Sequence, residues 1–147
     1  MKILVCTDGS EKSKKAIQEA SVIAEGCKVD EVAVIHVYDY NMFPYATGPI
    51  APEHVEQYQK IIDEQKAIKE KMLSEDEKIF KEKKINTHTI LKEGNPSDVI
   101  IKIAQEEGFD MIVVGSRGLG GLKKILLGSV SNAIMQEAEN CSVLVVK

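Results

Sequence analysis

Short apolar runs alternate with amphipathic stretches along the 147-residue chain, and this alternation predicts a β/α protein. Residues 3–6 form an apolar run that is followed by a polar turn at 7–10. Apolar residues then recur at helical spacing, with Ser10 as the predicted N-cap and Gly26 at the helix exit. Residues 31–37 are dense in β-branched side chains, which predicts a second strand covered on both faces.

The middle of the chain changes character after this strand. Prolines and a glycine punctuate residues 38–52, which predicts a long loop. Residues 53–83 contain neither proline nor glycine and predict one long helix. Its charges alternate in sign, which indicates a solvated face rather than a binding surface. Alternation over residues 85–91 predicts a third strand, and its polar face suits a sheet edge.

The last third of the chain repeats the β/α pattern. Asn95 and Pro96 have the residue types that open a helix. The apolar run 111–114 stops sharply at a glycine and predicts a central parallel strand. A helix is predicted over 129–139 and a fifth strand over 142–146.

This order of elements predicts a single domain, residues 1–147, with an α/β fold. We expect a doubly wound, five-stranded parallel sheet of Rossmann-like type with strand order 3-2-1-4-5. Ligands of such sheets bind outside the carboxyl ends of the strands, where the winding direction reverses. The loops that follow Cys6 and Val114 therefore carry the predicted site.

Composition narrows the class of function. The chain is 44% hydrophobic, 29% charged and 5% aromatic, as in a globular protein, and its net charge of -4 argues against nucleic-acid binding. No apolar run approaches the ~20 residues that cross a bilayer, and the chain opens directly with a strand. We therefore expect a cytoplasmic protein without a membrane role. Cys6, Cys27 and Cys141 lack C-x-x-C spacing and are expected to be reduced thiols.

Glycine is concentrated after the fourth predicted strand, where it fills four of the seven positions 115–121. Backbone N–H groups of such a loop can converge on phosphate oxygens. Gly128 and Ser129 then open a helix whose N-terminus is a second anion site, with the hydroxyls of Ser129 and Ser131 as added donors. Alternatively, the glycines end a strand and a short helical stretch at 122–127, and Ser129 caps the next helix. Spacing alone leaves both interpretations open.

Gly115, Gly118, Gly128 and Ser129 form the pattern G-x₂-G-x₉-G-S. This pattern resembles the ATP-binding branch of the universal stress protein family. The first strand with its turn and the last strand also look like that family, so the resemblance covers essentially the whole chain. It implies an adenine nucleotide alpha hydrolase-like fold.

The resemblance also implies which residues bind ATP. They are Thr7, Asp8, Val37, Gly115, Gly118, Gly128, Ser129, Val130 and Ser131. Asp8 is placed on the nucleoside side, although an aspartate at a strand end can also be a turn former. The adenine is placed against the backbone near Val37. Mg²⁺ or Mn²⁺ is expected to bind through the phosphates.

The sequence contains no G-x-x-x-x-G-K-[ST] motif and no recognisable pairing of a nucleophile with a base. The resulting hypothesis is that the protein is an ATP-dependent regulatory switch in stress response. It hydrolyses ATP slowly or only with a protein partner, which is unidentified. The loop Asn41–Pro52 is the segment expected to respond to the nucleotide. The first alternative is a metal-dependent ATP hydrolase or nucleotidyl transferase, and the second alternative is a nucleotide-independent homodimeric scaffold. The resemblance further implies that the edge strand Val143–Val146 pairs antiparallel in a homodimer.

Overall fold

The structure of the chain, a computed structural model, describes residues 1–39, 55–118 and 127–147. Along these residues the elements are β1 (Lys2–Cys6), α1 (Glu11–Gly26), β2 (Glu31–Tyr38), α2 (Val55–Glu82), β3 (Thr87–Glu93), α3 (Pro96–Glu106), β4 (Met111–Gly115), α4 (Ser129–Glu137) and β5 (Ser142–Val146).

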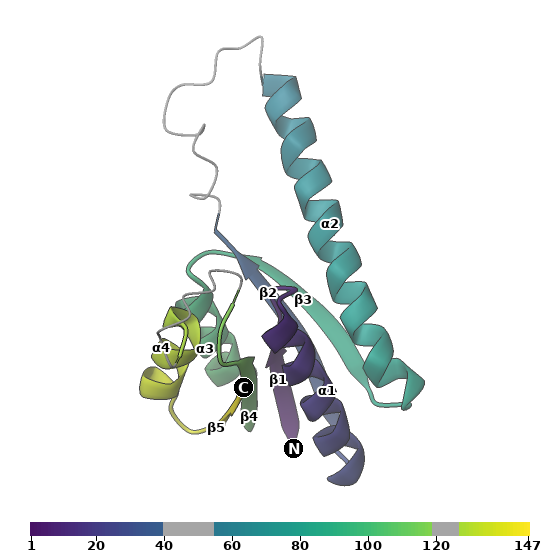
Figure 1. The fold of residues 1–147 in the computed structure, drawn as a ribbon, viewed down its shortest axis with the longest axis vertical. Helices are drawn as coiled ribbons and strands as arrows, with labels where there is room; N and C mark the ends of the chain where they lie inside the picture. Colours follow the sequence, from purple (N-terminus) through teal and green to yellow (C-terminus); the bar gives the residue numbers. More distant parts are fainter. Residues whose placement is uncertain (40–54, 119–126) are drawn as a thin grey trace.

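The strands form one parallel sheet in the order β3-β2-β1-β4-β5, which confirms the predicted topology. Helices α1 and α2 cover one face, and α3 and α4 cover the other (Figure 1). Strands β3 and β5 are the two edges of the sheet. The winding reverses between β1 and β4, so the carboxyl ends of these two strands meet where the sequence places the site.

The core explains why the central strands are continuously apolar. In β1, Leu4 packs with α3 and α4, whereas Ile3 and Val5 pack with α1 and α2. All three side chains are fully buried. A parallel sheet with helices on both faces leaves these strands no solvent-facing side, so alternation with polar residues is absent from them.

Three predicted boundaries are wrong. The third strand runs over Thr87–Glu93 rather than 85–91, because the N–H of Ile85 donates 3.1 Å to the Phe80 carbonyl and so terminates α2. The last helix ends at Glu137 rather than 139, since the next residue is already extended. Strand β2 also includes Tyr38, which the sequence assigns to the loop.

Other predictions fall outside the described residues. These are most of the long loop after β2, including the proposed responsive element 41–52, and the short helical stretch at 122–127 up to residue 126.

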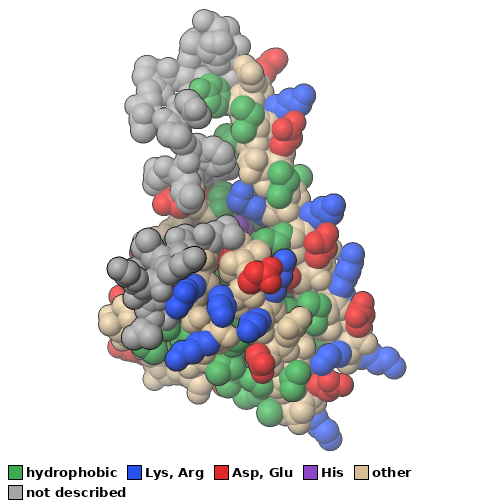
Figure 2. Space-filling model, in the orientation of Figure 1, with side chains coloured by type: hydrophobic (Ala, Val, Ile, Leu, Met, Phe, Trp, Pro, Cys, Tyr) green, Lys and Arg blue, Asp and Glu red, His purple; other side chains and the backbone are tan. Residues whose placement is uncertain are grey.

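Helix α2 extends far beyond the sheet, and its buried residues lie near its C-terminal end (Figure 1). They are Leu73, Asp76 and Phe80. Acidic and basic side chains alternate along the exposed part, as the charge pattern predicts (Figure 2). Within the described ranges, no helix combines the length and the hydropathy needed to cross a membrane.

Candidate functional site

The turn after β1 forms the first wall of the candidate site. The N–H of Ser10 donates to Asp8 Oδ1 at 3.0 Å, and Ser10 Oγ accepts from the N–H of Ser13 at 3.2 Å, which confirms Ser10 as the cap of α1. Gly9 has a φ of 78°, and a Cβ at this position would lie 2.9 Å from the Met72 sulfur. The backbone conformation therefore favours glycine in this turn, and a side chain there would also displace Met72.

The loop after β4 forms the second wall. A Cβ on Gly115 would lie 2.8 to 2.9 Å from backbone atoms of Lys12 and Ser13, so the first turn of α1 rests directly on the end of β4. A Cβ on Gly118 would overlap Asp8 Oδ2. The missing side chain of Gly118 is thus what allows this loop to lie alongside the Asp8 carboxylate, and two predicted site residues from distant parts of the chain are in contact.

The start of α4 forms the third wall and is tied to the same loop. The N–H of Gly128 donates to the Ser116 carbonyl at 2.8 Å, and the Ser131 hydroxyl lies 3.2 Å from the same oxygen. Ser116 and Ser131 are both buried. The Ser131 hydroxyl also lies 3.0 Å from the Gly128 carbonyl, so in this structure it stabilises the loop-to-helix junction.

Gly128, rather than Ser129, is the N-cap of α4. The alternative in which Ser129 caps this helix is therefore wrong. Gly128 has no side chain that could accept a hydrogen bond from the first turn of α4, whereas the side chains of Ser10 and Asn95 cap α1 and α3. The first intrahelical bond of α4 is donated by Asn132, so the N–H groups of residues 129–131 lie ahead of the helical ladder. Such a helix start is suited to an anion.

Val37 lies on β2 beyond the end of β1. The pairing of β1 with β2 ends at Cys6 and Ile35, followed by one bond of 2.9 Å from the Thr7 N–H to the Ile35 carbonyl. The Val37 side chain is buried in the core on the α3 face. A ligand would therefore meet the backbone of Val37 rather than its side chain.

Thr7 carries a contact that the sequence did not reveal. Its side chain is buried, and its hydroxyl donates to Asp76 Oδ2 of α2 at 2.7 Å. Burial raises the pKa of Asp76 above the ordinary range of an aspartate. One signal points to Asp76: it lies between Leu73 and Phe80 at the spacing of the buried helix face.

The electrostatic environment of the site is mixed. Burial lowers the pKa of His36, although its Nδ1 lies 2.7 Å from the Thr7 carbonyl. Lys and Arg side chains gather over the start of α1 and the carboxyl terminus (Figure 2). The sequence supplies Lys12 and Lys14 in the first turns of α1 and Lys147 after β5. Local positive charge therefore accompanies the glycine loops despite the acidic net charge.

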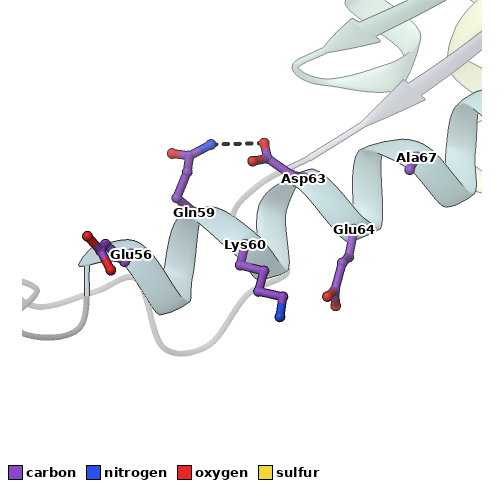
Figure 3. Close-up of a pocket in the computed structure, with 6 residues that line it drawn as sticks. All are labelled: Glu56, Gln59, Lys60, Asp63, Glu64 and Ala67. Atoms are coloured by element: carbon purple, nitrogen blue, oxygen red, sulfur yellow. Dashed lines mark hydrogen bonds between the residues drawn. The ribbon is translucent and has the colours of Figure 1, made fainter.

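A hollow elsewhere on the molecule does not belong to this site. It lies along the projecting half of α2, where Gln59 Nε2 donates a hydrogen bond of 3.0 Å to Asp63 Oδ1 (Figure 3). Its lining residues are Glu56, Gln59, Lys60, Asp63, Glu64 and Ala67. All six come from one polar face of one helix, so the described residues offer a ligand no second wall there.

Comparison with known proteins settles the family. The model of the universal stress protein family matches residues 1–147. The chain belongs to this family. Universal stress protein YxiE of Bacillus subtilis is 36% identical over 149 residues, which span 99% of this chain and 98% of YxiE.

Solved structures agree with the fold. The structure of MJ0577, a universal stress protein of Methanocaldococcus jannaschii, superposes with a TM-score of 0.83 at 31% identity, covering 99% of this chain and 94% of that chain. A universal stress protein family protein from Arabidopsis thaliana, solved with AMP bound, has a TM-score of 0.66 at 21% identity, covering 100% of this chain and 91% of that chain. This second likeness concerns the fold alone.

Proposed function

We propose that the protein binds ATP between the turn after β1, the loop after β4 and the start of α4. One observation carries the proposal: Gly118 meets the Asp8 carboxylate, while Gly128 is hydrogen-bonded to Ser116 and starts a helix without a side-chain cap. Three separate segments thus converge at the point where the sheet reverses its winding.

Each wall suits a different part of the nucleotide. The N–H groups of residues 129–131, which lie ahead of the helical ladder, and the hydroxyl of the exposed Ser129 suit phosphate oxygens. The Asp8 carboxylate suits ribose hydroxyls, and the backbone beyond the β1 end, at Val37, suits the adenine edge. The AMP found in the Arabidopsis protein makes adenine nucleotides the first ligand class to test.

We further propose that Mg²⁺ or Mn²⁺ accompanies ATP through its phosphates. Among residues 1–39, 55–118 and 127–147, no three His, Cys, Asp or Glu side chains converge as a metal cage. An ion held mainly by phosphate oxygens and water fits such surroundings.

In this proposal the protein is a cytoplasmic, nucleotide-dependent regulatory switch that hydrolyses ATP slowly or only with a protein partner. The acidic groups of the described site serve its architecture: Asp8 accepts from Ser10, and Asp76 accepts from Thr7. Purified protein incubated with ATP and Mg²⁺ should turn over less than about once per minute, far below ordinary enzyme rates. Faster turnover would favour the hydrolase or nucleotidyl transferase alternative instead.

The binding proposal is tested by calorimetric titration of nucleotide-free protein with ATP, and by identifying any nucleotide retained through purification. Gly118→Ala should weaken ATP binding at least tenfold, because the new methyl group displaces the Asp8 carboxylate. Gly26→Ala is the matched control at the opposite end of α1, since its Cβ would meet none of the described residues within 4 Å. A wild type that does not bind ATP in the titration, or equal ATP affinity of the two variants, contradicts the proposed site.

We also propose that β5 pairs with its counterpart in a homodimer. It is a sheet edge, and its apolar side chains are only partly buried. The Ser142 N–H and the Val146 carbonyl bond toward β4, so by alternation the N–H groups of Val143 and Val145 point outward. Val145→Pro should therefore yield a 16.2 kDa monomer by light scattering, whereas Val145→Thr stays dimeric. A monomeric wild type would contradict this pairing.

A further inference from the structure

Helix α2 touches the candidate site through one of its faces. The Asp76 carboxylate accepts from Thr7, the sulfur of Met72 lies against Gly9, and the Lys69 ammonium lies 5.3 Å from the centre of the Tyr38 ring. Tyr38 ends β2, so all three contacts lie at the carboxyl edge of the sheet. Positions 69, 72 and 76 share one helix face, which makes this a continuous contact.

The bond from Thr7 to Asp76 is the buried part of this contact. Thr7 is 5% exposed and Asp76 is 9% exposed. Burial of a carboxylate is costly, and an apolar residue at this position, between Leu73 and Phe80, would serve packing better. The titratable groups that act on Asp76 among the described residues include Lys14, Glu75 and His36. An acidic residue here therefore indicates a role beyond stability.

Thr7 is held from several directions. Its N–H donates to the Ile35 carbonyl at 2.9 Å, its carbonyl lies 2.7 Å from His36 Nδ1, and its hydroxyl donates to Asp76. The next residue is Asp8, whose carboxylate is the group proposed to meet the nucleoside. Loss of one of these restraints changes where the Asp8 side chain is presented, although the residue lost does not itself touch the ligand.

We propose that Asp76 is a positioning residue of the nucleotide site, which fixes the Thr7–Ser10 turn against α2 and thereby couples α2 to ATP occupancy. This inference rests on the proposed function and deepens it. It names α2 as a nucleotide-sensitive element, in addition to the loop 41–52.

The geometry of α2 amplifies small movements at this contact. Its buried residues lie at 73, 76 and 80, and 21 residues separate Asp76 from the helix start at Val55. At 1.5 Å per residue this part is about 32 Å long, so a tilt of about 5° at Asp76 moves the far end by about 3 Å. Nucleotide binding can thus change the surface that a protein partner meets.

The test compares variants of Asp76 in the full chain. Asp76→Leu removes the acceptor and should weaken ATP binding about tenfold by calorimetry, whereas Asp76→Asn keeps an acceptor oxygen and should stay within about threefold of wild type. Phe80→Leu is the control for a purely structural effect. It perturbs the same helix face one turn away, so it should lower the unfolding midpoint without changing ATP affinity.

Hydrogen exchange supplies the readout of coupling. ATP should slow amide exchange by at least threefold around residues 72–80 in wild type, Asp76→Asn and Phe80→Leu, but not in Asp76→Leu. If Asp76→Leu does not fold, Asp76→Ala removes the same acceptor with a smaller side chain and should show the same loss.

The outcomes separate the two proposals. A wild type that binds no ATP overturns the proposed function and this inference together. A wild type that binds ATP, with Asp76→Leu equal to it in affinity and in exchange, overturns the positioning role and leaves the nucleotide site standing.

Discussion

Replacement of Gly128 by serine should stabilise the fold and lower the affinity for ATP. Gly128 caps α4 with φ −70° and ψ 163°, a conformation that serine adopts readily at N-caps. Among the described residues the nearest atom to a Cβ there would be the Arg117 Cα at 3.4 Å, which is ordinary contact. The serine hydroxyl can then accept from the N–H of Val130 or Ser131, in the place proposed for a phosphate oxygen.

Both magnitudes follow from this geometry. A serine cap exceeds a glycine cap by a few tenths of a kcal/mol, and loss of glycine entropy in the unfolded chain adds about 0.4–1 kcal/mol. The sum of about 0.5–1.5 kcal/mol raises the melting temperature by roughly 1–6 °C for a chain of this size. One lost N–H bond to a charged phosphate costs about 1.5–3 kcal/mol, or about 10- to 150-fold in ATP affinity.

Thermal unfolding and calorimetric ATP titration of the same preparation measure the two effects. Gly128→Ala isolates the cause, because it adds Cβ without an oxygen and should leave ATP affinity within about threefold of wild type. If Gly128→Ser melts higher yet binds ATP as tightly as wild type, the first turn of α4 does not bind the phosphates. If it melts lower, our account of the cap is wrong.

Three further predictions concern the framework of the site. Gly115→Ala should destabilise the fold by about 1–3 kcal/mol in urea titration, because its Cβ would press on the backbone of Lys12. The pKa of His36 is lower in the folded state than in the unfolded state, so the unfolded chain binds this proton first as the pH falls. The free energy of unfolding of wild type, measured by urea titration, should therefore decrease as the pH falls below about 6.5. The decrease should be smaller in His36→Gln. The folded-state pKa of Asp76 is raised, so the folded protein binds this proton more tightly. The stability of Asp76→Asn relative to wild type should therefore shrink as pH falls from 7 to 4, measured by urea midpoints.

The fold was predictable because it depends on patterns that the sequence displays directly. Apolar runs such as 111–114 have no polar alternation because both faces of the sheet are covered. Boundaries were less predictable where one backbone bond decides them. Ile85 is apolar and reads as a strand residue, yet its N–H terminates α2.

The parts of the candidate site that consist of glycines could be predicted from the sequence. The part that depends on a tertiary contact was missed. Gly118 and Gly128 are visible as a spaced pattern, whereas Asp76 stands among many charges on a solvated helix. Its link to Thr7 spans 69 residues and arises only when α2 packs on the sheet. No local pattern reports a contact of that range, although the spacing of Leu73, Asp76 and Phe80 marks the face on which to look.

The three motif glycines perform three different physical tasks, so their common residue type conceals a division of roles. Gly115 lets α1 rest on the end of β4, Gly118 leaves space for the Asp8 carboxylate, and Gly128 starts a helix without a side chain that competes for its N–H groups. The first task concerns folding, and in our proposal the other two concern the nucleotide. Alanine at each position should accordingly separate them: a loss of stability at Gly115, a loss of affinity at Gly118, and little of either at Gly128 until an oxygen is added.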